Sequence, residues 1–448
     1  MSESQQSVFT RERHEHSKDH CVKLDETFDT RFDTRSDARF DARFDARFDA
    51  QGTLWPDLRR RFALGAPDTL YFDANSIGPM PLDAPARVLA VLDQGWRLER
   101  RRSWNNSDWL EQPRLLGASL ARVLGAEVAD VIVCDSTSVN QFKLLRHALS
   151  ISQRHVIVAQ SDVFPSNRYV AEGITRDAGT QLRLIDSIDD LEAALVHNDV
   201  AVVALSHVDY RSSERLDMAH INSLIHRHGA LSLWDLSHSA GAIDVALRES
   251  DTDLALGCGY KYLSGGPGAP SFIYVHPRHQ QTAWPAICGW MGHADTFAFE
   301  STFEPAAGVA RFLVGTPAVL ANTAFAAAAD IWQQVDPREL ERRHGSLSGL
   351  LIELVEGCEL GQHLQLASPR EHRRRGGHVA FRFGGAQSLA QALVADGVVV
   401  SARKPDALRF GIHPLVTRHI DIWQAVQKLR AILASGCWQE PRFASDQV

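Results

Sequence analysis

Asp235 and Lys261 are the two residues whose types and surroundings most directly suggest chemistry. Asp235 lies near the end of the apolar run GALSLWDLS (229–237), and Lys261 follows the apolar run TDLALGCG (252–259). Lysine is rarely buried because its ammonium group loses hydration there. A buried lysine has a lowered pKa, which favours the neutral amine. A neutral amine can attack a carbonyl carbon and form an imine.

Pyridoxal phosphate gives both residues a role. The cofactor forms an imine with a lysine, and a buried carboxylate keeps its ring nitrogen protonated. We therefore interpret Lys261 as the Schiff-base lysine and Asp235 as the partner of the ring nitrogen. Taken singly, Asp235 could be a helix N-cap and Lys261 a surface lysine. Their positions at the ends of consecutive predicted strands favour the functional interpretation.

A phosphate group also needs hydrogen-bond donors. The segment DSTSVN (135–140) ends a predicted strand and opens a helical stretch. Thr137 and Ser138 would offer hydroxyl and backbone N–H groups at the helix N-terminus, although an ordinary cap would look the same. The sequence contains no GxxxxGK[ST] loop, no GxGxxG after a strand, no GxSxG and no HExxH. This argues against common nucleotide-binding, esterase and metalloprotease functions, and we expect no metal site.

The elements that must position these residues form an α/β pattern. Between Thr53 and about residue 320, helical patterns alternate with short runs rich in Val, Ile or Leu, which we predict as strands at 130–136, 155–161, 199–206, 229–237 and 252–259. Such runs are typical of a mostly parallel sheet covered by helices, which binds ligands at the carboxyl ends of its strands. A helix at 322–335, strands at 378–383, 397–403 and 407–414, and a closing helix at about 420–435 predict a smaller α+β domain over 321–448.

Residues 1–52 differ from this pattern because they include the repeat FDTRFDTRSDARFDARFDARFDA. We predict a low-complexity extension that is disordered or weakly helical, with a partner-binding amphipathic segment as the alternative. The net charge of −8 gives no reason to expect nucleic-acid or membrane partners. The chain lacks an apolar run of about 18 residues and an apolar secretory signal, so we expect a cytoplasmic protein. The six cysteines show no CxxC spacing, and we expect reduced, mostly buried thiols.

Several phrases in order resemble kynureninase, a fold-type-I pyridoxal-phosphate enzyme, over roughly residues 65–430. The phrases include SWNNSDW (103–109), DSTSVNQFKLL (135–145), WDLSHSAGAIDVAL (234–247), GCGYKYLSGGPGAPSFIYV (257–275), GWMGHADTFAFE (289–300) and RFLVGTPAVL (311–320). The WDLSH and GYKYL–GGPG runs alone could belong to several relatives, whereas the GWMGH and GTP phrases in this order are more specific. The resemblance implies a homodimer with shared active sites. It also implies hydrolytic cleavage of the Cβ–Cγ bond of L-kynurenine, or of its 3-hydroxy form, to an anthranilate and L-alanine in tryptophan catabolism.

The resemblance also implies roles around the cofactor. Tyr260 would touch the phosphate and act as an acid–base group, and Ser206 and His238 would lie near the cofactor. Phe164 of the phrase FPSN (164–167) would stack on the cofactor ring, and Pro165, Ser166 and Asn167 of the same phrase would help to bind the cofactor. Asn167 departs from the family, which usually has aspartate there. An amide keeps a hydrogen bond but not the charge, so the change predicts weaker activity or an altered substrate preference.

For the substrate, the resemblance implies that Arg409 binds the α-carboxylate and that Trp290 and Thr316 complete the site from the other subunit. Trp104, Gly315 and Thr316 match bacterial members that favour kynurenine over its 3-hydroxy form. By residue type alone, the two tryptophans could be core or interface aromatics, and Arg409 could be a surface or ion-paired arginine. Similarly, His238 could be a hydrogen-bonded core histidine.

Two other functional classes remain open. One is an aminotransferase or a desulfurase-like lyase, but a desulfurase needs a reactive, accessible cysteine, and Cys258 and Cys288 lie in contexts that look poor for that role. The other is a non-catalytic cofactor-binding relative. Retention of Lys261, Asp235 and Tyr260, together with Arg409, argues against this second class.

Overall fold

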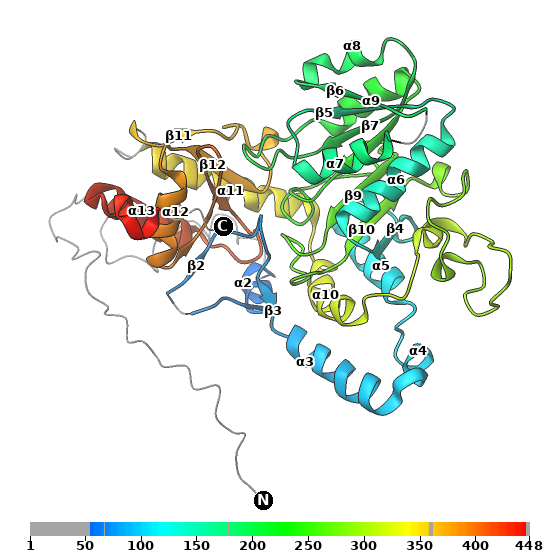
Figure 1. Cartoon of the computed structure of the whole chain (residues 1–448). Helices are drawn as coiled ribbons and strands as arrows, with labels where there is room; N and C mark the ends of the chain where they lie inside the picture. The colour runs from blue at the N-terminus through cyan, green and yellow to red at the C-terminus, as the bar shows by residue number, and fades with distance from the viewer. Residues whose placement is uncertain (1–53, 67, 177–178, 358–361, 445–448) are drawn as a thin grey trace, which may run out of the picture. The chain divides into compact units, whose positions relative to one another are not determined.

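The computed structural model describes residues 54–66, 68–176, 179–357 and 362–444 (Figure 1). The predicted N-terminal extension, residues 1–52, lies outside the described residues. None of the helices within these ranges is both long enough and apolar enough to cross a membrane.

A seven-stranded sheet with the order β4-β10-β9-β8-β7-β5-β6 is the centre of the larger part of the structure, in the cyan-to-green part of Figure 1. Strands β6, β5, β7, β8 and β9 run parallel to one another, and β10 is antiparallel to both β9 and β4. The strands are β4 (Val131–Cys134), β5 (Val156–Gln160), β6 (Gln181–Ile185), β7 (Val200–Ser206), β8 (Leu231–Asp235), β9 (Leu254–Cys258) and β10 (Ser271–Val275).

All five strands predicted for this sheet are present, and the mostly parallel α/β fold is confirmed. The strands β6 and β10 were not predicted. The partly exposed sequence of β6, QLRLI, offers no continuous apolar run. The fully buried strand β10 directly follows a glycine-rich loop, so no helix separates it from the preceding strand.

Both faces of the sheet are buried, because successive side chains of a strand point to opposite faces. In β4, Val133 belongs to one apolar core together with Trp234 and Phe325, whereas its neighbour Ile132 belongs to a second core with Leu144. The principal helices are α5 (Gln112–Leu124), α6 (Thr137–Ile151), α7 (Pro165–Ile174), α8 (Leu191–Leu195), α9 (Met218–Arg227) and α10 (Val319–Trp332).

The C-terminal part contains a four-stranded antiparallel sheet with the order β11-β12-β15-β14. Its elements are α11 (Pro337–Glu356), β11 (Gln365–Leu366), β12 (His378–Arg382), α12 (Ala386–Ala395), β14 (Ser401–Arg403), β15 (Ala407–Gly411) and α13 (His419–Ser435). The strands and the closing helix predicted here are therefore present. Leu70 and Phe72, from the start of the described chain, share the apolar core of this part, and β2 (Leu70–Tyr71) pairs with β13 (Val398–Val399).

The sheet topology brings the predicted site residues to one edge. Ser206 ends β7 and lies directly opposite Asp235, which ends β8. Lys261 follows the end of β9, and Thr137 begins the helix that follows β4. Strand β4 runs parallel to β9, because both are antiparallel to β10. The carboxyl ends of these strands therefore meet at the same edge, where open α/β sheets bind ligands.

Candidate active site

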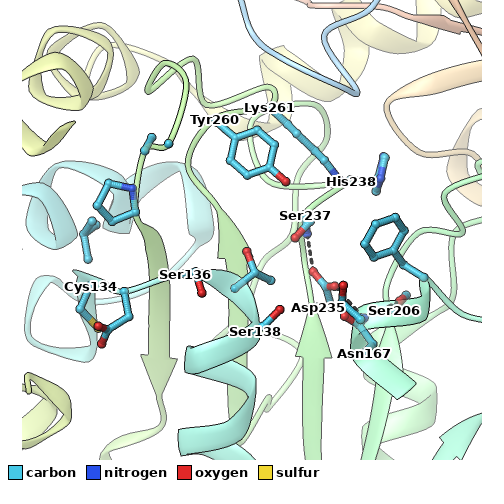
Figure 2. A pocket seen from close by; sticks show the side chains of 18 of the residues that line it. Cys134, Ser136, Ser138, Asn167, Ser206, Asp235, Ser237, His238, Tyr260 and Lys261 are labelled. Carbon is cyan, nitrogen blue, oxygen red and sulfur yellow. Dashed lines mark hydrogen bonds between the residues drawn. The ribbon is translucent and has the colours of Figure 1, made fainter. Parts of the chain in front are cut away.

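A pocket of about 780 Å³ opens at this edge of the sheet (Figure 2). Its walls come from the ends of β4, β7, β8 and β9, from the first turns of α6 and α7, and from the segment before α10. Twelve of the predicted site residues line it: Thr137, Ser138, Phe164, Ser166, Asn167, Ser206, Asp235, His238, Tyr260, Lys261, Gly315 and Thr316. Four do not line it: Pro165, Trp104, Trp290 and Arg409.

The Asp235 carboxylate is held by a donor on each oxygen. Its Oδ1 accepts a hydrogen bond of 2.9 Å from the backbone N–H of Ser237, and its Oδ2 accepts one of 2.8 Å from Asn167 Nδ2. Figure 2 shows Asp235 beside Asn167 and Ser206 at the pocket wall. Two N–H donors stabilise the ionised form of a carboxylate and fix its orientation. This arrangement suits a partner for a protonated ring nitrogen.

Lys261 points into the pocket towards His238, and its Nζ lies 2.8 Å from His238 Nε2 (Figure 2). Burial lowers the pKa of the Lys261 amine, and the nearby positive charge of Arg409 lowers it further. Burial and the charge of Lys261 also hold the pKa of His238 well below its ordinary value. The neutral imidazole can therefore accept a hydrogen bond from the amine. The site favours the neutral amine that imine formation needs.

The first turn of α6 offers donors to an anion. Ser136 caps the helix, with its Oγ accepting from the backbone N–H of Val139 at 3.4 Å. Thr137 and Ser138 follow it, and both line the pocket. The first N–H groups of a helix have no acceptor within the helix, and the helix dipole favours a negative charge there. The turn therefore fits a phosphate group.

A buried lysine fixes the turn that precedes this helix. Lys143 is 1% exposed, and its Nζ lies 2.6 Å from Asp135 Oδ2 and 2.8 Å from the carbonyl oxygen of Phe312. Asp135 has a φ of +45°, a backbone conformation that residues with side chains seldom adopt. The ion pair with Lys143 thus stabilises the strained turn just before Thr137.

The aromatic wall of the pocket involves Phe164 and Tyr210. The Phe164 ring centroid lies 6.0 Å from Lys261 Nζ and 5.5 Å from the Tyr210 ring, which it meets edge to face. Phe164 remains 46% exposed, so its ring is available to a ligand. Pro165 begins α7 directly after it, and its fixed φ suits the first helical position. The remaining pocket aromatic, Tyr260, has its pKa raised by burial and by the nearby Cys258 and Asp235, so its phenol stays protonated at neutral pH.

Arg409 lies in β15 and is 1% exposed. Its Nη1 donates to the backbone carbonyl of Tyr210 at 2.6 Å, and its Nη2 donates to Ser401 Oγ at 3.0 Å. Among the described residues, no carboxylate forms an ion pair with it, which removes the alternative of an ion-paired surface arginine. Burial lowers its pKa to about 10. A buried guanidinium without a carboxylate partner is able to bind the carboxylate of a ligand.

The residues expected to distinguish substrates do not all lie at the pocket of their own chain. Gly315 and Thr316 line the pocket of their own chain, whereas the resemblance implied that Thr316 reaches the site of the other subunit. Trp104, in α4 (Ser103–Asn106), packs edge to face on Trp109 at 5.2 Å. Trp290 is 37% exposed and packs against Phe297 at 6.1 Å.

Of the four cysteines that the structure describes, two match the expectation of buried thiols and two do not. Cys134 and Cys258 are buried, but Cys437 is partly exposed and Cys288 is exposed. Cys288 lies in the long segment between β10 and α10 rather than at a strand end, and it does not line the pocket. Cys134 lines the pocket and is 8% exposed, with burial raising the pKa of its thiol.

Three residues that contribute to the site were not predicted. Ser237 supplies a backbone N–H to Asp235, Tyr210 supplies a carbonyl to Arg409 and packs on Phe164, and Ser401 supplies a hydroxyl to Arg409. Tyr210 lies four residues after the predicted strand end at Ser206. That position is the signal that could have identified it. The sequence carries no comparable signal for Ser401.

Comparison with known proteins decides the family. The family model described as the kynureninase C-terminal domain matches residues 340–429. A kynureninase of Burkholderia pseudomallei (strain K96243) is 41% identical over 395 residues, which cover 87% of this chain and 94% of that protein. The chain belongs to the kynureninase family. A kynureninase of Pseudomonas fluorescens is 40% identical over 400 residues and covers 88% of this chain and 95% of that protein.

Solved structures support the fold. The apo cysteine desulfurase of Thermococcus onnurineus matches with a TM-score of 0.69 at 18% identity, over 85% of this chain and 98% of that chain. The cystine C–S lyase C-DES, solved with glycine covalently linked to its PLP cofactor, matches with a TM-score of 0.70 at 19% identity, over 83% and 98% of the two chains. At this identity the matches confirm the fold-type-I architecture predicted for the chain. They do not distinguish lyase, transferase and hydrolase activities.

The described residues fit pyridoxal phosphate, the cofactor expected for this family. Lys261 has a lowered amine pKa, and Asp235 presents a doubly hydrogen-bonded carboxylate at the end of the adjacent strand. The first turn of α6 fits the phosphate, and the Phe164 ring is free to pack on an aromatic ring. The carbonyl carbon, the ring nitrogen and the phosphate of the cofactor thus each have a matching partner in one pocket.

Proposed function

We propose that this chain is a pyridoxal-phosphate-dependent hydrolase that cleaves L-kynurenine to anthranilate and L-alanine. The observation that carries the proposal is the pairing of Lys261 and Asp235 at neighbouring strand ends, in a pocket of a kynureninase-family chain. Bound pyridoxal phosphate would supply an electron sink for the electron pair left at the substrate Cα. The polypeptide supplies binding, orientation and proton transfer.

Lys261 would hold the cofactor and, once released, remove the proton from the substrate Cα. Its lowered pKa favours the neutral amine that can accept this proton. His238 Nε2, at 2.8 Å, would orient the amine. Tyr260 stays protonated at neutral pH and so would enter the reaction as a proton donor near the substrate carbonyl and Cβ.

Other residues would bind rather than react. Thr137 and Ser138 would hold the phosphate, and Phe164 would pack on the cofactor ring, with Ser166 and Ser206 beside it. Arg409 would bind the substrate α-carboxylate with two parallel hydrogen bonds after a small movement of its guanidinium into the pocket. Its burial without an ion-pair partner supports this role, because an uncompensated buried charge is costly until an anion binds.

The test is an assay of purified protein with pyridoxal phosphate and L-kynurenine that follows anthranilate by its fluorescence. We expect product from the wild type and none from Lys261→Ala. An absorption band of bound cofactor without anthranilate would leave the cofactor assignment standing and remove kynurenine as the substrate. No cofactor band in either protein would refute the whole proposal.

The alternative within the same cofactor class is an aminotransferase or a desulfurase-like lyase. The solved structures that share the fold include a cysteine desulfurase and a cystine C–S lyase. A desulfurase needs a cysteine that reaches the substrate, but Cys288 is exposed outside the pocket lining, and the pocket cysteine Cys134 has a raised thiol pKa. An aminotransferase would leave the cofactor in its amine form after one half-reaction, and the spectrum of the enzyme mixed with an amino acid would reveal it.

We also propose that the chain acts as a homodimer with shared sites. Trp290, Phe297 and Phe299 are 37%, 49% and 77% exposed, and their rings contact one another in sequence. Exposed aromatic clusters of this kind favour a protein interface. Sedimentation analysis would test the dimer. A mixture of Lys261→Ala and Trp290→Ala proteins would recover part of the activity if each site draws Trp290 from the other subunit.

The substrate preference depends on the residues that contact the aromatic ring of the substrate. Gly315 and Thr316 line the pocket, and Trp104 would have to reach it from the second subunit. We propose a preference for kynurenine over 3-hydroxykynurenine. We also propose that the protein is cytoplasmic, and that the chain comprises a large domain over residues 53–320 and a small domain over residues 321–448. Relative kcat/KM values for the two substrates would test the preference directly.

A further inference from the structure

Asn167 makes a direct contact with the carboxylate that faces the proposed cofactor. Its Nδ2 donates to Asp235 Oδ2 at 2.8 Å and lies 3.5 Å from Ser206 Oγ. Its own backbone carbonyl accepts a hydrogen bond of 2.8 Å from Gln141 Nε2. This last contact ties the first turn of α7 to α6, so the Asn167 amide is presented to Asp235 from a fixed backbone.

At this position the chain has a donor that does not titrate, where the family usually has aspartate. Asp235 Oδ1 already accepts from the Ser237 backbone, so Asn167 supplies the donor for the second oxygen. A carboxylate at residue 167 would face Asp235 at about the same distance. Two carboxylates so close do not ionise independently of each other. Over part of the pH range, the pair shares one proton. An amide donates its hydrogen bond at every pH and adds no second titrating group beside Asp235.

We propose that Asn167 is a positioning residue that holds the Asp235 carboxylate oriented toward the cofactor ring nitrogen without placing a second carboxylate beside it. The proposal rests on the proposed cofactor and does not depend on kynurenine as the substrate. Asn167 acts through Asp235, so its removal affects how the cofactor is held and how its spectrum depends on pH.

The experiment compares wild type, Asn167→Ala, Asn167→Asp and the control Asn198→Asp. Asn198 is exposed in the turn after α8, and its substitution adds the same charge far from the pocket. Two quantities are measured on each protein: the dissociation constant of pyridoxal phosphate from the apoenzyme, and the visible absorption of the bound cofactor from pH 5 to pH 9. Urea denaturation of each variant checks that it is folded.

We expect Asn167→Ala to weaken cofactor binding about tenfold, since hydrogen bonds to charged groups are the stronger ones. We expect Asn167→Asp to add an acid-side spectral transition, or to move the existing one up by about one pH unit, because the new pair shares a proton. Asn198→Asp should match the wild type in both measurements.

The proposal fails if folded Asn167→Ala binds the cofactor as tightly as the wild type and folded Asn167→Asp shows the wild-type pH dependence. It also fails if the wild type binds no pyridoxal phosphate, and the proposed function then fails with it. If the wild type binds the cofactor and makes no anthranilate while the variants shift as expected, the role of Asn167 stands and only the substrate assignment is lost.

Discussion

Replacement of the buried lysine of α6, Lys143→Met, should destabilise the protein and weaken cofactor binding together. Lys143 Nζ donates to the carbonyl oxygen of Phe312 at 2.8 Å and pairs with Asp135 Oδ2 at 2.6 Å. Methionine has nearly the same volume, so the substitution leaves no large cavity. What it removes is the ammonium group and its hydrogen bonds.

The magnitude follows from the two oxygen acceptors that are left behind, because the third acceptor, the Cys134 sulfur at 3.3 Å, forms only a weak hydrogen bond. A buried carbonyl without a donor costs about 1–3 kcal/mol, which applies to Phe312. The Asp135 side chain is 32% exposed and can regain water, so its lost partner adds only about 1 kcal/mol. The free energy of unfolding should therefore fall by about 2–4 kcal/mol. Asp135 also holds the strained turn before Thr137, so the affinity for pyridoxal phosphate should fall as well.

The assay is differential scanning calorimetry of the holoenzyme, with a cofactor titration of the apoenzyme. Lys428→Met is the matched control, because Lys428 is a partly exposed helix lysine that pairs with Asp396 at 3.5 Å outside the pocket. We expect the control to change the free energy of unfolding by less than about 1 kcal/mol. If Lys143→Met has the same melting temperature as the control variant and binds the cofactor with wild-type affinity, the assigned role of Lys143 in the turn is wrong.

Three further outcomes are expected. Ser401→Ala should raise KM several-fold with kcat nearly unchanged, because Arg409 loses an acceptor that orients it; an effect on kcat alone would contradict this. Tyr260→Phe should lower kcat at least about tenfold while the cofactor stays bound, and unchanged turnover would remove Tyr260 from proton transfer. Burial alone would raise the pKa of Asp253, but hydrogen bonds from His226 and other partners hold it below its ordinary value of 3.8. A depressed folded-state pKa stabilises the protein above about pH 4, and this contribution is lost as the pH falls below that value. Denaturation midpoints should therefore drop more steeply on acidification for the wild type than for Asp253→Asn, and parallel curves would count against the assignment.

Much of the architecture could be predicted because the strands of the central sheet are buried on both faces. A strand such as β7, Val200–Ser206, then has a continuous apolar sequence that ends in a polar residue, and this pattern is local. Strand β6 was missed for the opposite reason, since an edge strand that is partly exposed does not need apolar residues throughout. The buried strand β10 was missed although its own sequence is apolar, because it follows β9 through a glycine-rich loop without the intervening helix that marks the other strands.

Some residues of the site could likewise be predicted from the sequence, and others could not. Lys261, Asp235 and Thr137 could be identified because each lies next to a predicted strand end, and strand ends of one sheet meet at one edge. Trp104 and Trp290 were inferred from family phrases, and neither lines the pocket of its own chain. Side-chain placement across elements depends on packing that periodicity does not encode.

The sequence alone determined the chemical types at the site and the order of the elements that carry them, because strand length, apolar runs and polar strand ends are local properties. The hydrogen-bond partners of those residues, by contrast, depend on how distant elements pack in the folded protein. The amide of Asn167 meets Asp235 across 68 positions of sequence, and the Arg409 guanidinium meets the Tyr210 carbonyl across 199. Such contacts depend on hydrogen-bond geometry and burial between distant segments, and these arise only when the elements pack together.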